Sequence, residues 1–117
     1  MGDVTGLQVI VNLYAADITF TNSEHSGNNR RIASMTTGNV GNAWIPWCDS
    51  AAQFPAHHMR IESGDLNFFV WQHGPTIRYS RDNWSADAPS IPGNAGVGQS
   101  VAWALDANGQ LTQTIYS

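Results

Sequence analysis

LNFFVWQHGPTIRYSRD, residues Leu66–Asp82, is the stretch that decides the fold, because its pattern predicts a β-hairpin. Gly74-Pro75 is expected to form the two-residue turn, which pairs Trp71 with Arg78. Successive side chains of a strand point to opposite faces, so this register divides the hairpin into two sets. One set is apolar and suits a core: Leu66, Phe68, Val70, Ile77 and Tyr79. The other set combines aromatic rings with hydrogen-bonding groups: Asn67, Phe69, Trp71, His73, Thr76, Arg78 and Ser80.

The C-terminal segment predicts a second hairpin. One register pairs Leu105 with Leu111 and needs Gly109 in the left-handed conformation within a three-residue loop. A strict two-residue turn would instead set apolar residues against polar ones, so we expect the three-residue loop. That register places the apolar residues of both strands on one face: Val101, Trp103, Leu105, Leu111 and Ile115.

Two further stretches predict where strands run and where one is interrupted. Leu7–Tyr14 alternates, and the alternation predicts a strand with this core face: Leu7, Val9, Val11 and Leu13. Gly38–Asn42, GNVGN, is expected to interrupt a weaker strand pattern. If the N-terminal strand pairs with either hairpin, both chain ends lie in one sheet.

Short strand signals, closely spaced turns and the lack of a long helical period together predict the fold class. We expect residues 1–117 to form one domain, an all-β, compact antiparallel β-sandwich of about seven or eight short strands. A small β-barrel is the alternative. A chain of 117 residues can bury a core without disulfides, and Cys48 is the only cysteine.

The segment 83–99 is the longest one without a strand or helix pattern. It is rich in Ser, Ala, Pro, Gly and Asn. A structureless loop of this length is often functional, so one interpretation is a lid or specificity loop. The other is that the segment only crosses from one sheet to the other.

The charge balance argues against nucleic acid as a partner. All five basic residues are Arg, Lys is absent and the formal net charge is −4. Binding of phosphates without sequence preference needs a basic stripe, which this chain lacks. A polybasic membrane anchor is also missing.

The sequence opens with MGDVTG and has no charged segment followed by an apolar one, so we expect no signal peptide. The longest apolar runs, such as Phe68–Trp71, are far too short for a transmembrane segment. We therefore expect a cytoplasmic protein, or one released without a recognisable signal peptide. A mature secreted form fits the sequence as well.

Two indoles, Trp44 and Trp47, flank Pro46 in the segment AWIPWCDS. Proline within such a run indicates an edge or a loop rather than a central strand. One interpretation is that the two rings plug the end of the sandwich, since Trp buries a large area and its N–H is easily satisfied at a rim. The alternative is a platform for a ligand.

The sequence contains no recognisable catalytic or metal-binding motif. No spacing pairs Cys48 with one of the four histidines, and no GxSxG elbow exists. His57 and His58 are adjacent on an expected strand, so they point to opposite faces and do not share a metal easily. We therefore expect no catalytic residues, no metal and no cofactor, and a binding protein rather than an enzyme.

Recognition of sugars is the function that these residues favour. A sugar ring offers apolar C–H groups to an indole and hydroxyl groups to polar side chains. The polar hairpin face and the residues that follow it supply such a set, and we expect the ligand-binding residues to be Asn67, Trp71, His73, Arg78, Asp82 and Trp84. The sequence leaves open whether the face with Phe69 and Trp71 is exposed or is part of the core.

The first hypothesis is thus a lectin-like module with glycans or glycoconjugates as partners, in which a homo-oligomer would add multivalency. An alternative of a different class is an oligomeric β-sandwich protein with membrane-lipid or toxin-like activity, which uses the same aromatic face. A small hydrolase is the second alternative.

Overall fold

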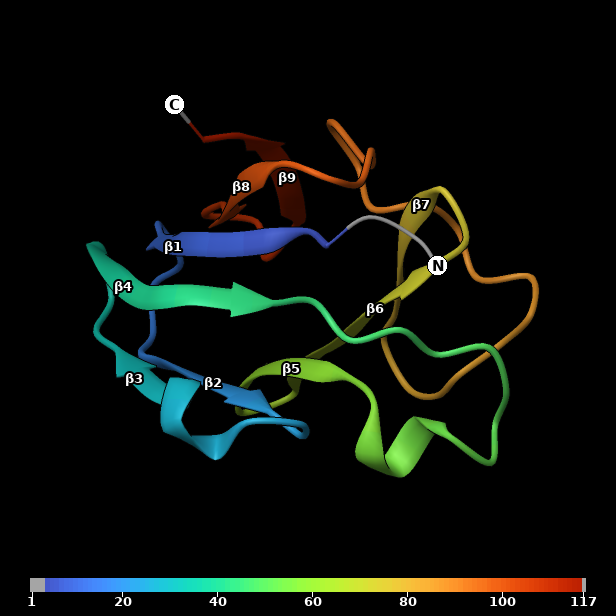
Figure 1. The fold of residues 1–117 in the computed structure, drawn as a ribbon. Coiled ribbons are helices and arrows are strands. Elements are labelled where there is room, and N and C mark those ends of the chain that lie inside the picture. The colour runs from blue at the N-terminus through green and yellow to red at the C-terminus, as the bar shows by residue number, and fades with distance from the viewer. Residues whose placement is uncertain (1–3, 117) are drawn as a thin grey trace.

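The fold is a sandwich of two β-sheets (Figure 1). The computed structural model describes residues 4–116, which form a four-stranded sheet in the order β4-β1-β8-β9 and a five-stranded sheet in the order β3-β2-β5-β6-β7. The all-β sandwich is therefore confirmed. The strands are β1 (Gly6–Asn12), β2 (Ile18–Asn22), β3 (Arg30–Ile32), β4 (Thr36–Trp44), β5 (Met59–Ser63), β6 (Leu66–His73), β7 (Thr76–Ser80), β8 (Ser100–Leu105) and β9 (Leu111–Ile115).

Residues 4–116 thus hold nine strands, where about seven or eight were expected. The expected interruption at Gly38–Asn42 is wrong, because these residues lie within β4, and the chain turns instead at 33–35, between β3 and β4. Two short 3₁₀ turns complete the regular structure, η1 (Ser26–Asn28) and η2 (Phe54–Ala56). One pairing departs from the antiparallel expectation, since β1 runs parallel to β8. This pairing brings β1 and the C-terminal hairpin into one sheet. No helix in the described part of the chain is long and apolar enough to cross a membrane.

Both predicted hairpin registers are confirmed. In the β6–β7 hairpin Trp71 pairs with Arg78, and in the β8–β9 hairpin Leu105 pairs with Leu111. Gly109 is left-handed, with φ +79°. Turn chemistry explains the agreement, because the side chain of Asp106 accepts hydrogen bonds from the backbone N–H groups of the loop it begins.

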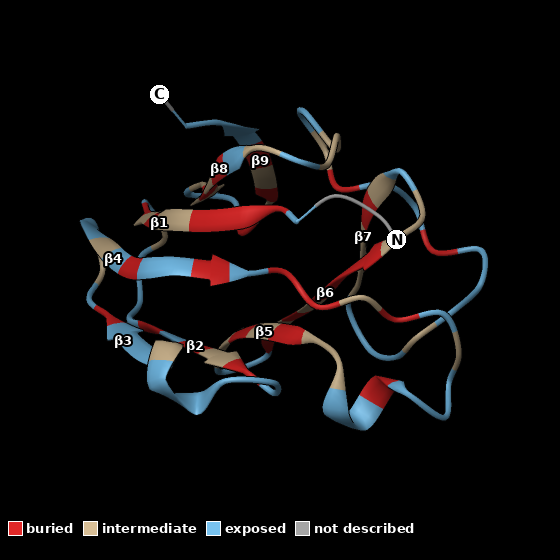
Figure 2. Ribbon diagram, viewed as in Figure 1, coloured by how far each residue is buried: buried red, intermediate tan, exposed pale blue. Residues whose placement is uncertain are grey.

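The main core lies between the two sheets, and Figure 2 marks its buried residues along the strands of both. Phe20 of β2 meets Trp103 of β8 edge to face, with ring centroids 6.0 Å apart. The indole N–H of Trp103 donates to Oε1 of Gln113 at 2.8 Å, so the largest ring of this core keeps a polar partner. The apolar face predicted for the β6–β7 hairpin forms part of this core: Leu66, Phe68, Val70, Ile77 and, half-buried, Tyr79.

The predicted core face of the N-terminal strand is wrong beyond Leu7. Ile10 is fully buried, whereas Val9 is only half-buried and Val11 and Leu13 also lie outside the core. The reason is a bulge at Gln8, where the register of β1 shifts against both β4 and β8. One extra residue in a strand moves every later side chain to the opposite face.

The segment 83–99 crosses from β7 to β8 and closes one side of the sandwich. Ser90 forms a bridge with Arg78 on the edge of the five-stranded sheet, and Gly93 forms one with Gln113 on the edge of the four-stranded sheet. These contacts satisfy backbone groups that two edge strands would otherwise expose. The interpretation of this segment as a crossing between sheets is confirmed.

Candidate functional site

The polar face of the β6–β7 hairpin is covered by loops. Trp71 is fully buried and packs in a second apolar cluster with Cys48, Phe54 and Ala88. Phe54 meets the Trp71 indole edge to face, with ring centroids 5.5 Å apart. The open question about this face is thereby answered: Trp71 belongs to a core, and its ring is closed to a ligand. Sequence could not reveal this, because the covering residues come from distant loops.

The guanidinium of Arg78 also has a structural role. Its Nε donates to Oγ1 of Thr76 at 2.8 Å, and its Nη1 donates to the carbonyl of Ala88 at 2.7 Å. The second bond ties the crossing segment to β7. His73, at the end of β6, places its Nδ1 3.3 Å from Oδ1 of Asp49.

The other predicted site residues are spread along the sheet and the start of the crossing segment. Asn67 accepts a hydrogen bond from Nε of Arg60 at 2.6 Å and donates to the carbonyl of Arg81 at 2.7 Å. Asp82 is exposed, and Trp84 packs half-buried against the Trp71 cluster. A shallow depression of about 350 Å³ lies nearby, and none of the predicted site residues lines it. Its lining residues are Tyr79, Ser80, Arg81, Ser85, Asp87, Ala88 and Pro89.

A second depression lies where β2 and β4 end, and we call it the Trp44 pocket. Its volume is about 360 Å³, within the range of small-molecule sites. It joins the loop after β2, the 3₁₀ turn η1 and the end of β4. Its lining residues are Asn22, Glu24, His25, Asn28, Gly41, Asn42 and Trp44.

Trp44 is the aromatic wall of this pocket and is 62% exposed. The interpretation that it plugs the sandwich end is therefore wrong. Ala43 before it is buried in the core, and alternation along β4 directs the next side chain outward. Trp47 follows a different course: it is half-buried, and its backbone bridges to Gln72 of β6. Most of the Trp44 side chain is therefore open to solvent.

Two amides form the frame of the pocket, the buried Asn22 and the half-buried Asn28. Asn22 is 4% exposed, and its Nδ2 donates to Oδ1 of Asn28 at 3.0 Å. Nδ2 of Asn28 donates in turn to the carbonyl of Val40 at 3.2 Å, which links η1 to β4. Oδ1 of Asn22 accepts from the backbone N–H of Glu24 at 3.0 Å and fixes the start of the loop. Because both amides are committed to these bonds, they shape the pocket.

Asn42 reaches the pocket through an irregular stretch of β4. Gly41 and Asn42 are both left-handed, with φ +73° and +59°. Asn tolerates this conformation better than most residues, and Gly adopts it freely. Oδ1 of Asn42 accepts a hydrogen bond from Nε2 of Gln8 at 2.6 Å. The structure gives Nδ2 of Asn42 no partner within residues 4–116, so its two N–H groups are free to donate.

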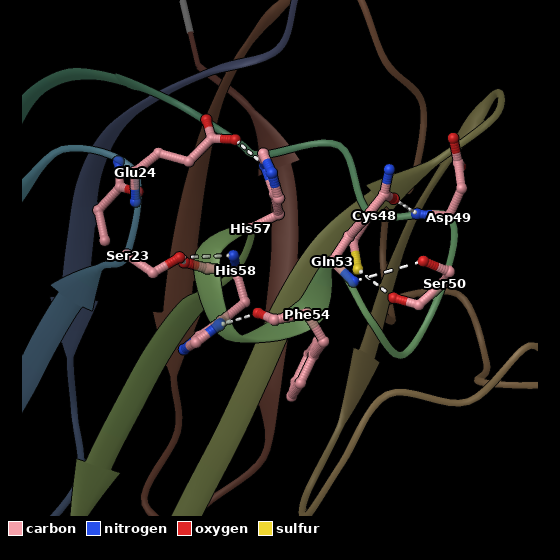
Figure 3. A network of polar contacts seen from close by, with 10 residues as sticks. Ser23, Glu24, Cys48, Asp49, Ser50, Gln53, Phe54, His57 and His58 are labelled. Atoms are coloured by element: carbon pink, nitrogen blue, oxygen red, sulfur yellow. Dashed lines mark hydrogen bonds and ion pairs between the residues drawn. The ribbon is translucent and has the colours of Figure 1, made fainter.

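Glu24 is held by His57, which lies just before β5. Its Oε2 lies against Nδ1 of His57, as Figure 3 shows. Beside this pair, Oγ of Ser23 donates to the carbonyl of His58 at 2.9 Å, and the backbone N–H of His58 donates to Oγ of Ser23 at 2.8 Å. These contacts fasten the loop after β2 to the start of β5. Glu24 lines the pocket, and within residues 4–116 its Oε1 has no hydrogen-bond partner, so this oxygen is free to accept.

The thiol of Cys48 is a poor nucleophile. Cys48 is fully buried, and desolvation raises the pKa of its thiol, which disfavours the reactive thiolate. Its Sγ donates to the carbonyl of Ser50 at 3.3 Å (Figure 3). The described residues also contain no group of three His, Cys, Asp or Glu side chains placed to hold a metal ion.

The Trp44 pocket therefore combines an exposed indole, amide donors on Asn42, a carboxylate acceptor on Glu24 and the imidazole of His25. Of these, sequence reasoning singled out only Trp44, as an alternative platform. The others lie in stretches that carry only loop signals, GNVGN and SEHSGNN, and it is the packing of β4 beside η1 that brings them together. Comparison of the chain with models of protein families, with curated proteins and with solved structures finds no match.

Proposed function

We propose that this protein is a non-enzymatic carbohydrate-binding module and that the Trp44 pocket is its sugar site. The observation that carries the proposal is the 62% exposure of Trp44 beside polar side chains in a pocket of about 360 Å³. An indole face packs on the C–H groups of a sugar ring, and the surrounding groups bond to its hydroxyls. The proposal keeps the lectin-like function that the sequence favours and moves its site from the β6–β7 hairpin to β4.

The balance of hydrogen-bonding groups supports this function. A sugar hydroxyl both donates and accepts, so its site needs both kinds of partner. Oε1 of Glu24 is an acceptor, and Nδ2 of Asn42 is a donor. Both are held in place, Glu24 by His57 and Asn42 by Gln8. A site whose groups are already held loses little conformational entropy on binding.

A binding screen with matched variants tests the proposal. The wild type, Trp44→Ala and Tyr116→Ala are applied to a glycan array, and hits are titrated by calorimetry. Tyr116 is the control because it is an exposed ring, 45% accessible, outside the pocket. We expect Trp44→Ala to weaken binding about tenfold or more and Tyr116→Ala to leave it unchanged. Absence of glycan binding by the wild type, or equal binding by Trp44→Ala with an unchanged circular dichroism spectrum, overturns the proposal.

A second candidate function is contact with membrane lipid, and a different end of the molecule favours it. Leu13 is 44% exposed and Met35 is 68% exposed, on two turns that a hydrogen bond from Ser34 to the Tyr14 carbonyl joins. Met35 is left-handed, with φ +63°, a conformation uncommon for a side chain of this size. Exposed apolar side chains at loop tips are typical of surfaces that contact lipid or another protein.

Sedimentation with phosphatidylcholine vesicles tests this second candidate. The Leu13→Ser/Met35→Ser double variant should lose any co-sedimentation of the wild type. Ile115→Ser is the control, since Ile115 on β9 is 44% exposed, as much as Leu13. Vesicle binding that survives the double variant, or no binding by the wild type, excludes this role for the Leu13 and Met35 turns.

A further inference from the structure

We propose that the Trp44 pocket selects neutral sugars over acidic ones, with Glu24 as the residue that excludes a ligand carboxylate. This inference rests on the proposed function and names the ligand class of the same site. The ligand is a neutral pyranose that stacks on Trp44, donates a hydroxyl hydrogen to Glu24 and accepts one from Asn42.

The charges around the pocket argue for a neutral ligand. Glu24 is the only carboxylate among the lining residues, and no Arg is among them. The nearby Arg30 is turned to its own loop, where Nη1 donates to the carbonyls of Gly27 and Asn29, both at 2.8 Å. The chain has no Lys. Sites that bind carboxylates or sulfates place an Arg or Lys against the anion, and His25 is the only lining side chain that can become a cation.

The contacts of Glu24 explain why a second carboxylate is excluded. Nδ1 of His57 contacts Oε2, so the carboxylate is fixed and Oε1 is left for the ligand. A carboxylate accepts hydrogen bonds and cannot donate, so Oε1 needs a donor such as a hydroxyl. A ligand carboxylate at this place would offer no hydrogen and would face a like charge. At short range in a partly exposed site, that repulsion lowers affinity by about tenfold.

The other two groups fit a neutral ring. Asn42 donates through an uncharged amide, which can bond to a hydroxyl oxygen and does not require an anion as its acceptor. Trp44 stacks on C–H groups, and charge on the ligand adds nothing to that contact unless it is positive. The pocket volume of about 360 Å³ lies at the low end for small-molecule sites, which suits one or two sugar rings.

Paired sugars that differ in one group test the inference. Methyl glucoside, galactoside and mannoside are each titrated beside the corresponding methyl uronide, in which a carboxylate replaces the C6 hydroxymethyl group. Calorimetry is done at neutral pH and low salt with the wild type, Glu24→Gln and Asp65→Asn. Asp65 is the control, because it is an exposed carboxylate that does not line the pocket.

For the wild type, we expect the neutral sugar of a binding pair to bind about tenfold more tightly than its uronide. Glu24→Gln should reduce that gap to about threefold or less, because the amide carries no charge, and Asp65→Asn should leave it unchanged. A uronide that binds the wild type as tightly as its neutral partner, through Trp44, overturns the selectivity and leaves carbohydrate binding intact. If the difference in affinity between the neutral sugar and its uronide persists in Glu24→Gln, Glu24 is not the residue that causes it. If neither sugar of any pair binds, the proposed function itself fails.

Discussion

The side chain of Gln8 donates a hydrogen bond to Oδ1 of Asn42 at 2.6 Å and thereby joins two irregular points in neighbouring strands. Gln8 occupies the bulge of β1, and Asn42 occupies a left-handed position in β4. Leu7 pairs with Ala43 and Val9 pairs with Asn39, so the bulge leaves Gln8 opposite residues 40–42. Bulges often redirect a side chain near a functional site. Here the bulge places the amide of Asn42 at the Trp44 pocket.

Gly6→Ala should weaken sugar binding with little effect on stability. A Cβ at this position would lie 2.1 Å from Oδ1 of Asn42, so the amide must move. The amide is the far end of a flexible side chain, and the free energy of unfolding should therefore change by less than about 1 kcal/mol. Affinity should fall about threefold to tenfold, the worth of one hydrogen bond. Calorimetric titration and urea unfolding measure the two effects, and an unchanged affinity would show that Asn42 does not contact the ligand.

Gly93→Ala should destabilise the fold strongly. Gly93 has φ +93°, and a Cβ there would lie 2.3 Å from the carbonyl oxygen of Gln113 on β9. Backbone strain and the clash should together lower the free energy of unfolding by about 2 kcal/mol or more. Gly96→Ala is the control, since its nearest contacts are ends of flexible side chains at 3.1 Å or more. Equal urea midpoints for the two variants would contradict the structural role of the crossing segment.

Trp71→Ala should also lower stability, in contrast to Trp44→Ala. The fully buried Trp71 leaves a cavity when truncated, and such changes cost about 3 to 5 kcal/mol. Trp44 is mostly exposed, so its truncation should change the free energy of unfolding by less than about 1 kcal/mol. Thermal unfolding followed by circular dichroism distinguishes the two. Similar losses for both would mean that Trp44 packs in a core.

Asp17 should stabilise the fold at neutral pH and lose this effect in acid. Its pKa is lowered, first by the hydrogen bond from the backbone N–H of Ser34 and then by Arg31. A carboxyl whose folded pKa lies below the unfolded value of about 3.8 stabilises the folded state above that value. The stabilisation is lost as the pH falls through the lower, folded pKa. Urea unfolding of the wild type and Asp17→Asn should therefore differ at pH 7 and converge toward pH 2, whereas a constant difference would exclude the ionic contribution.

The hairpins could be predicted from sequence because short-range signals determine them. Gly74-Pro75 marks one turn, and Asp106 with Gly109 marks the other, so alternation on each side gives the register. The bulge at Gln8 could not be predicted, because it depends on the strands on both sides of β1. A shift of one residue then reversed the expected face of Val9.

The candidate site was harder to predict for a similar reason. Trp71 and Trp44 carry the same side chain, and their exposure is decided by segments distant in sequence: loops cover Trp71, whereas the space before Trp44 stays open. Glu24 and Asn42 lie in polar loop-like stretches with no pattern that links them. Only the arrangement of the two sheets brings them to one pocket.

The indole N–H signals of the five tryptophans offer the most direct measurement of the central claim. In a ¹H–¹⁵N NMR titration with the neutral methyl glycoside that binds most tightly, the Trp44 signal, assigned from its loss in Trp44→Phe, should shift in a saturable way. The signals of the buried Trp71 and Trp103 should stay in place. A titration that moves the Trp71 signal and leaves the Trp44 signal unchanged would contradict the placement of the sugar site in the Trp44 pocket.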